Sequence, residues 1–148
     1  MRIWLMTSEW NSTGVSDLER WPRGYVEALV SAGHEITVFG TEPDEHRQTP
    51  EGAWYVGLPI AESSNGSNGV PSEPAEGGLS RRPAESLRMA SLLLERAVRT
   101  GAPDLIETQS AYGLPYFLFQ RQLTQNTAIA RTPIVVDALG SHVGRLAA

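Results

Sequence analysis

The stretch GHEITVF, residues 33–39, decides the fold of this chain. It begins with Gly33, which suits the left-handed conformation that ends many helices, and continues as the β-branched run 35–39, which is typical of a strand. The segment before it, 18–32, carries apolar residues at three- and four-residue spacing, which indicates an amphipathic helix packed on a sheet. The periodic residues are Leu18, Trp21, Tyr25, Val26, Leu29 and Val30.

A second apolar run, RIWLM at residues 2–6, precedes this helix and predicts the first strand. Because a helix joins it to the strand 35–39, the two strands are expected to be parallel. A polar loop, 7–16, leads into the helix. Pro22 fits a first helical turn, so the regular helix is expected to begin near Trp21.

The rest of the chain repeats the alternation of strands and helices. Residues 53–58 form a third predicted strand, 104–108 a fourth and 133–138 a fifth, whose central IVV is expected to be buried on both faces. Two further helices are predicted, over 83–101 and over 113–125. The residues expected to face the core are Leu87, Ala90, Leu94, Ala97 and Val98 in the first, and Tyr116, Phe117 and Phe119 in the second.

This order of elements predicts an α/β fold with a doubly wound, Rossmann-like parallel sheet. The whole chain, 1–148, is expected to form a single domain, with a disordered insertion at 61–80 where almost no residue is apolar. Ligands of such sheets bind outside the carboxyl ends of the strands. Candidate site residues should therefore lie in the loops 7–17, 109–114 and 139–143.

Composition excludes several classes of function. The net charge is −5, the isoelectric point is near 5.2 and no cluster of basic residues appears, so no nucleic-acid partner is expected. The chain has no Cys, which rules out a disulfide framework and a thiolate nucleophile, and its three His residues lack metal-ligand spacing. The opening apolar run is too short for a signal-peptide core, so a cytoplasmic location is the simplest expectation.

Three blocks of sequence resemble a known enzyme family. They are GHEITV at 33–38, APDLIE at 102–107 and TPIVV at 132–136, and their order and spacing agree with the family pattern. Together with the RI that opens the first strand and LER at 18–20, they resemble the retaining nucleotide-sugar glycosyltransferases typified by sucrose and glycogen synthases and by bacterial mannosyltransferases. These are the family-four-like enzymes of the GT-B fold. The resemblance covers most of the chain except 61–80.

The resemblance implies an enzyme of two facing Rossmann-like domains. This chain would be the N-terminal, acceptor-side domain, incomplete at its C-terminus and inactive alone, because the nucleotide-sugar donor binds to a missing C-terminal domain. The sugar would be transferred with retention of configuration, with the nucleotide sugar as a substrate and with no cofactor or metal. The partners would be that donor and a sugar-containing acceptor. The full enzyme is a candidate for peripheral membrane association, and the isolated chain is expected to self-associate through the strand 133–138.

The loop positions and the resemblance together nominate substrate-binding residues, while the catalytic residues stay unassigned. The nominated residues are Gly14, Val15, Ser16, Gln109, Tyr112, Ser141 and His142. Gly14 either lets the donor phosphates approach bare backbone or is an ordinary turn residue. Gln109, like Glu107 before it, either bonds an acceptor hydroxyl or is simply a polar strand end. Tyr112 either stacks on a sugar ring or caps the helix that follows.

Two departures from the family pattern bear on these residues. Ser16-Asp17 stands where the family usually has Gly-Gly, and an Asp facing a diphosphate would repel it. Leu139 stands where many relatives have a His, so His142 could replace that His only if its loop folds back. Either Gly14 takes the role of the Gly-Gly pair, or this chain contacts the donor differently.

Two other functions compete with a glycosyltransferase. A dinucleotide-binding dehydrogenase is disfavoured, because no G-x-G-x-x-G follows the first strand. A non-catalytic Rossmann-like binding or scaffolding module is the remaining alternative, since each block of sequence that resembles the family also occurs in unrelated α/β proteins.

Overall fold

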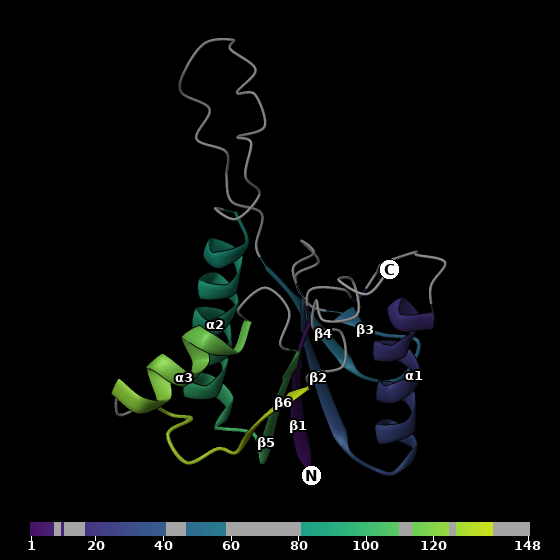
Figure 1. Ribbon diagram of the computed structural model, residues 1–148. Helices are drawn as coiled ribbons and strands as arrows, with labels where there is room; N and C mark the ends of the chain where they lie inside the picture. The colour runs from purple at the N-terminus through teal and green to yellow at the C-terminus, as the bar shows by residue number, and fades with distance from the viewer. Residues whose placement is uncertain are drawn as a thin grey trace, which may run out of the picture.

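The computed structural model shows an α/β fold in which helices cover both faces of one sheet (Figure 1). It describes the following residues: 1–7, 10, 17–40, 47–58, 81–109, 114–124 and 127–137. The predicted insertion at 61–80 lies outside them. The elements in chain order are β1 (Arg2–Met6), α1 (Asp17–Ser31), β2 (Glu35–Gly40), β3 (Arg47–Gln48), β4 (Trp54–Gly57), α2 (Arg81–Thr100), β5 (Leu105–Gln109), α3 (Leu114–Thr124) and β6 (Ile134–Asp137).

The sheet has the strand order β3-β4-β2-β1-β5-β6. Every pairing is parallel except that of β3 with β4, a short antiparallel pair that the sequence analysis did not predict. From β1 the chain builds outward through β2 to β4, and it then returns to place β5 and β6 on the other side of β1. The sheet is therefore doubly wound, as predicted, and its strand order reverses between β1 and β5.

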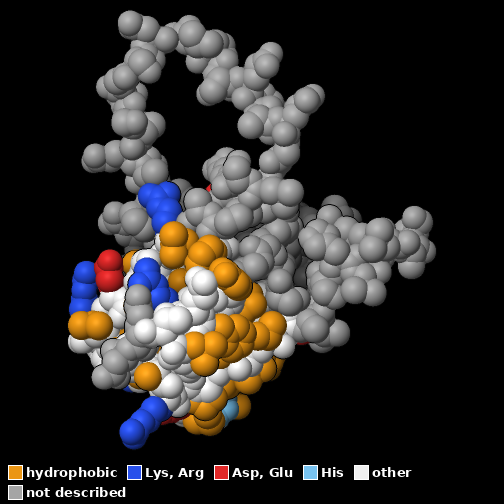
Figure 2. All heavy atoms as spheres, turned by 60° about the vertical axis from the view of Figure 1, so that its left-hand side comes forward, with side chains coloured by type: hydrophobic (Ala, Val, Ile, Leu, Met, Phe, Trp, Pro, Cys, Tyr) orange, Lys and Arg blue, Asp and Glu red, His pale blue; other side chains and the backbone are white. Residues whose placement is uncertain are grey.

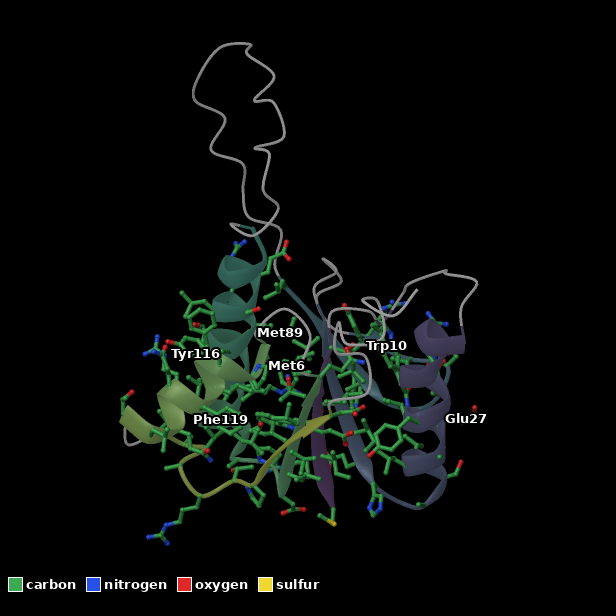
Figure 3. The ribbon with its side chains drawn as sticks, viewed as in Figure 1. Met6, Trp10, Glu27, Met89, Tyr116 and Phe119 are labelled. Carbon is green, nitrogen blue, oxygen red and sulfur yellow. The ribbon has the colours of Figure 1, made fainter. Side chains whose placement is uncertain are left out.

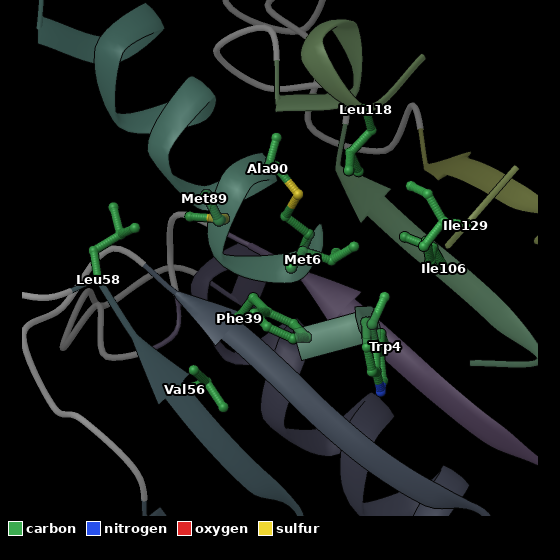
Figure 4. Close-up of a cluster of buried hydrophobic side chains, with 12 residues drawn as sticks. Trp4, Met6, Phe39, Val56, Leu58, Met89, Ala90, Ile106, Leu118 and Ile129 are labelled. Atoms are coloured by element: carbon green, nitrogen blue, oxygen red, sulfur yellow. The ribbon is translucent and has the colours of Figure 1, made fainter. Parts of the chain in front are cut away.

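Two apolar clusters lie on the two faces of the sheet, and β1 contributes to both. Ile3 and Leu5 join the cluster under α1, while Trp4 and Met6 join the cluster under α2 and α3. Figure 4 shows the second cluster, and Figure 3 shows Met6 and Met89 in the space between β1 and α2. A strand covered on both faces must be apolar at nearly every position, which is why RIWLM does not alternate between polar and apolar residues.

Glycines end the first two helices at the predicted places. Gly33 has a φ of 83° and Gly101 a φ of 82°, in the left-handed region that a side chain disfavours. After α1, the amide of Gly33 donates to the Val30 carbonyl over 2.9 Å and that of His34 to the Leu29 carbonyl over 3.1 Å. These two bonds form the Schellman motif typical of a helix that ends at a glycine. After this motif the chain continues directly into β2.

The first helix begins earlier than predicted. It starts at Asp17 rather than near Trp21, and Pro22 lies inside it. A proline in the second turn removes one helical hydrogen bond, because it lacks an amide hydrogen. Only one carbonyl, four residues before Pro22, loses its amide partner, so the helix continues through the proline.

The other two helices are rotated relative to the prediction. The buried positions of α2 are Ser86, Met89, Ala90, Leu93 and Ala97, whereas Leu87 is 39% exposed and Val98 is 77% exposed. In α3 the fully buried residue is Leu118, and the prediction of a core position was wrong for Tyr116, which is 57% exposed. The hydroxyl of Tyr116 instead accepts a hydrogen bond from Gln120. Spacing alone shows which residues share a face, but the neighbouring helix decides which face is covered.

The strand β6 lies at the edge of the sheet formed by the described residues. Its Val135 and Val136 are 48% and 37% exposed, so the prediction that this run is buried on both faces was wrong. Figure 2 shows exposed apolar side chains gathered on the side of the molecule that carries α2 and α3. In α3, Tyr116 and Leu123 are 57% and 83% exposed.

Trp10, which follows β1 in the chain, contacts one residue of β4 and one of α1. Its ring stacks on that of Tyr55 with centroids 6.0 Å apart, and the guanidinium of Arg23 lies 5.7 Å from the indole centroid. The Nε of Arg23 also donates to the Trp10 carbonyl over 3.4 Å. The ring of Tyr55 lies so close to Gly40, at the end of β2, that no side chain fits there.

Replacing Gly40 by Ala is expected to lower the free energy of unfolding by about 1–3 kcal/mol, because the added methyl group would overlap the fully buried ring of Tyr55. Urea unfolding followed by tryptophan fluorescence measures this change. The matched control is Gly24→Ala in α1, where nothing lies within 4 Å of the added methyl group. It should raise the free energy of unfolding by about 0.5–1 kcal/mol. Equal effects of the two substitutions would contradict the packing described for Tyr55.

Candidate functional site

A group of polar side chains lies at the carboxyl ends of three neighbouring strands. Thr7 directly follows β1, Gln109 ends β5 and Asp137 ends β6. Because β1, β5 and β6 are parallel, their carboxyl ends meet at one edge of the sheet, and the strand order reverses between the first two. This edge is where doubly wound sheets bind their ligands.

These side chains also share one face of the sheet. Glu107 and Gln109 are two residues apart, and with Leu105 they point to the α1 side, where Leu105 packs against the apolar cluster. Asp137 is the register partner of Gln109, so it points to the same side. The amide and the two carboxyls therefore form one polar area on the β5 and β6 half of this face.

Two hydrogen bonds, one buried and one partly buried, connect this area to the elements around it. The hydroxyl of Thr7 donates to Oε1 of Gln109 over 2.9 Å, across the point where the strand order reverses. The hydroxyl of Tyr25, from α1, donates to Oε2 of Glu107 over 2.8 Å. Thr7, Glu107 and Gln109 are all buried, with 0%, 7% and 7% of their surface exposed.

The bond from Thr7 orients the amide of Gln109. Since Oε1 accepts from Thr7, the amide nitrogen is turned away from that hydroxyl, and the described residues provide no acceptor for it. A side-chain amide nitrogen has two hydrogens to donate. The site thus presents a fixed donor beside the carboxyls of Glu107 and Asp137, which are acceptors.

Burial is the largest cause of the pKa shifts of Glu107 and Tyr25. Removal from water raises the pKa of Glu107 above its ordinary value of 4.5, the hydrogen bond from Tyr25 lowers it, and the carboxylate of Asp137 raises it. Burial also raises the pKa of Tyr25 to about 12, with further contributions from Glu107 and Asp137. Tyr25 therefore stays protonated and acts only as a donor to Glu107. A buried carboxyl with a raised pKa near the carboxyl end of a strand is a candidate for a functional site.

Of the substrate-binding residues predicted from the sequence, the structure describes only Gln109. The others, Gly14, Val15, Ser16, Tyr112, Ser141 and His142, lie outside the described residues. Around Gln109 the fold gathers Glu107, which the sequence analysis had considered, and three residues that it had not. Thr7 and Asp137 could have been found as polar residues that end apolar strands, but Tyr25 was assigned to the apolar face of its helix.

A second polar hollow lies at the opposite edge of the sheet. It is lined by Met1, Arg2, Gly33, Glu35 and Asp104. Its polar groups already bind one another: the guanidinium of Arg2 donates to the carbonyls of Thr100 and Ala102, and the Arg2 amide donates to Asp104 over 2.7 Å. These contacts hold the amino end of β1 to the end of α2. These contacts give the hollow a structural explanation.

Neither a metal-binding cluster nor a membrane-spanning helix is found among the described residues. No group of three or more His, Asp or Glu side chains among them is placed to hold a metal ion. None of the helices in these parts of the chain has the length and apolar character needed to cross a membrane.

The fold is similar to those of two kinds of solved structure. Sucrose-phosphate synthase from Thermosynechococcus elongatus, a GT-B glycosyltransferase, aligns with a TM-score of 0.55 at 15% identity over 84% of this chain. This chain spans only 31% of that protein. The C-terminal domain of a hydrogenase from Pyrococcus furiosus aligns in two structures, with TM-scores of 0.55 and 0.52 at 17% and 15% identity. These alignments cover 92% of this chain and 89% and 90% of that domain.

At these identities the similarity shows the fold alone, which is Rossmann-like and resembles that of a glycosyltransferase domain. No protein-family model and no curated protein matches the sequence.

Replacing Tyr25 by Phe is expected to lower the free energy of unfolding by about 1–3 kcal/mol, because the buried Oε2 of Glu107 loses its donor. In an absorbance titration at alkaline pH, the variant should lack the tyrosine whose pKa is about 12. The control is Tyr116→Phe, which removes an exposed hydroxyl and should change stability by less than about 0.5 kcal/mol. A late-ionising tyrosine that persists in the Tyr25 variant would contradict the pairing.

Replacing Glu107 by Gln is expected to make stability less dependent on pH. The pKa of Glu107 is raised in the folded state, so its stabilising contribution is complete below pH 4.5 and is lost as the pH rises through the folded value. Gln resembles the protonated carboxyl at every pH. The variant should therefore gain stability relative to the natural chain as the pH rises from 4.5 toward neutrality, as measured by urea unfolding at each pH.

The control for this comparison is Glu27→Gln, which removes the same charge from the outer side of α1 (Figure 3). The difference between the two variants isolates the effect of burial at position 107. If the stability of the Glu107 variant relative to the natural chain stays constant or falls as the pH rises, burial does not disfavour the charged form of Glu107.

Proposed function

We propose that this chain is the acceptor-binding part of a glycosyltransferase that transfers a sugar from a nucleotide-sugar donor with retention of configuration. The observation that carries the proposal is the buried polar group of Thr7, Glu107 and Gln109 where the strand order reverses. The resemblance in sequence and the likeness in fold to sucrose-phosphate synthase support it.

The chemistry of the site suits a sugar. Each sugar hydroxyl both donates and accepts hydrogen bonds, and it is best held between an acceptor and a donor. The carboxyls of Glu107 and Asp137 are acceptors, and the amide nitrogen of Gln109 is a donor on the same face of the sheet. A hydroxyl-bearing acceptor could bond both kinds of group at once.

The same groups make this face a poor site for the donor. A nucleotide sugar carries a diphosphate, which proteins bind with basic side chains or with backbone amides at helix starts. The strand-end site presents carboxyls instead. In this proposal the donor is therefore bound by a second domain of a longer protein, and the reaction uses the nucleotide sugar as a substrate without a cofactor or metal.

The second candidate function is a Rossmann-like binding or scaffolding module without chemistry of its own. The observation that favours it is the hydrogenase domain, which aligns with this chain over nearly its whole length. A domain of this size and fold therefore exists as part of a protein that is not named as a glycosyltransferase. Binding of sugars at the strand-end site distinguishes the two candidates.

Chemical-shift mapping of the isotope-labelled chain tests the proposal. Neutral sugars such as glucose, mannose and fructose are expected to shift the amide signals of Thr7, Glu107 and Gln109, because these residues line the strand-end site. The amides of Arg2 and Asp104, at the opposite edge of the sheet, serve as the internal control and should not move. In parallel, the chain incubated with nucleotide sugars and these acceptors should release no nucleoside diphosphate.

Two outcomes would contradict the proposal. If the sugars shift no signal at the strand-end site, the acceptor function is wrong and the module is favoured. If the chain alone turns over a nucleotide sugar, the assignment of the donor to a second domain is wrong.

A further inference from the structure

Thr7 and Gln109 form a buried pair at the point where the strand order reverses. Both side chains lie on the α1 side of the sheet, as Leu5 does two residues before Thr7. The Thr7 hydroxyl donates to Oε1 of Gln109 over 2.9 Å, and Thr7 is 0% exposed. The backbone amide of Thr7 also donates to the Phe39 carbonyl of β2 over 2.9 Å. Thr7 is therefore held by the strands on both sides of β1.

The amide nitrogen of Gln109 is open to a ligand. With Oε1 turned toward Thr7, the nitrogen is turned away from that hydroxyl and has no acceptor among the described residues. Some buried polar side-chain atoms in the described part of the chain do lack a partner, such as Oγ1 of Thr49, but the Gln109 nitrogen is not among them. The nitrogen is therefore accessible from solvent, and its two hydrogens can be donated there.

We infer that Thr7 is a positioning residue, which fixes the Gln109 amide so that it meets the ligand only as a hydrogen-bond donor. The ligand atom opposite this nitrogen is then an acceptor, such as the oxygen of a sugar hydroxyl. The inference rests on the proposed function and deepens it, because it assigns part of the specificity to a residue that acts through Gln109.

A side-chain amide that is free to turn recognises a ligand less well, for two reasons. Its oxygen and nitrogen differ in hydrogen bonding but hardly in shape, so a half-turn presents an acceptor where the ligand needs a donor. A long, flexible side chain also loses conformational freedom when a ligand orders it, which weakens binding. The bond from Thr7 removes both disadvantages, because it orders the Gln109 amide before a ligand binds.

The test separates donation by the protein from the other contacts of the sugar. Whichever of glucose, mannose and fructose binds most tightly is compared with its deoxy and deoxyfluoro analogues, one hydroxyl at a time, by chemical-shift titration. Fluorine accepts a hydrogen bond weakly and donates none, whereas hydrogen does neither. At the position opposite Gln109, the fluoro analogue is expected to bind at least about threefold more tightly than the deoxy analogue, because part of one hydrogen bond is kept.

Two variants of the pair should lower this preference. In Thr7→Val the amide is free to turn, so the preference should fall toward one, and the parent sugar should bind about two- to tenfold more weakly. In Gln109→Glu the carboxylate still accepts from Thr7 but presents an oxygen to the ligand, so the preference should be lost. Thr7→Ser keeps the hydroxyl and should keep both the affinity and the preference.

The matched control is Thr108→Val. Thr108 is also 0% exposed, and its hydroxyl donates to the backbone carbonyl of Gln109 over 3.3 Å, but its side chain lies on the opposite face of β5. The substitution removes the same group beside the same residue without freeing the amide, so the preference should stay. Comparison with Thr7→Val separates positioning from a general loss of stability. If Thr7→Val loses its fold by circular dichroism, Gln109→Glu decides, since it keeps the bond from Thr7.

Each outcome decides the inference. A sugar that binds without a preference for fluoro over deoxy at any position would overturn it and leave the proposed acceptor function standing. A preference that survives in Thr7→Val or in Gln109→Glu, or that falls equally in Thr108→Val, would also overturn it. The absence of any sugar binding would overturn the proposed function, on which the inference rests.

Discussion

The structure depends on the parallel pairing of β1 with strands on both of its sides. β2 lies along one side and β5 along the other; α1 joins β1 to β2, and α2 leads from β4 to β5, so helices cover the sheet. The connections that follow β1 and β5 therefore leave the sheet on opposite faces, and ligands of such sheets bind outside the carboxyl ends of these two strands. Thr7 and Gln109 lie at these carboxyl ends and form a hydrogen bond with each other. The position of the candidate site is thus a consequence of the strand order.

The candidate site places polar side chains where the neighbouring strands carry apolar ones. On the α1 side of the sheet, β1 and β2 carry Ile3, Leu5 and Val38. On the same side, β5 carries Glu107, which is the register partner of Leu5, and Gln109. A carboxyl buried in a sheet lowers stability unless a hydrogen bond compensates, and Tyr25 supplies one from α1. Burial raises the pKa of Glu107, although the hydrogen bond from Tyr25 lowers it. A buried carboxyl of this kind agrees with the binding role that we propose for this end of the sheet.

Local signals in the sequence were enough to predict the architecture. Gly33 and the β-branched run after it define a helix end and a strand within a few residues, and the same logic holds at Gly101. The exposure of Val135 and the orientation of α2 could not be predicted, because they depend on which elements lie beside them. The site shows the same division. Gln109 was found because it ends a strand, but the bond from Tyr25 to Glu107 joins residues 82 positions apart and has no local signature.

In the proposed function, the ligand-binding site of this chain lies at the carboxyl ends of β1 and β5, where the strand order reverses. A crystal structure of the chain with a neutral sugar bound tests it most directly. The account predicts a sugar with hydroxyl groups in hydrogen-bond distance of Glu107 and of the Gln109 amide nitrogen, with the bond between Thr7 and Gln109 preserved. A sugar bound instead in the hollow between Arg2 and Asp104, with the strand-end site empty, would contradict it.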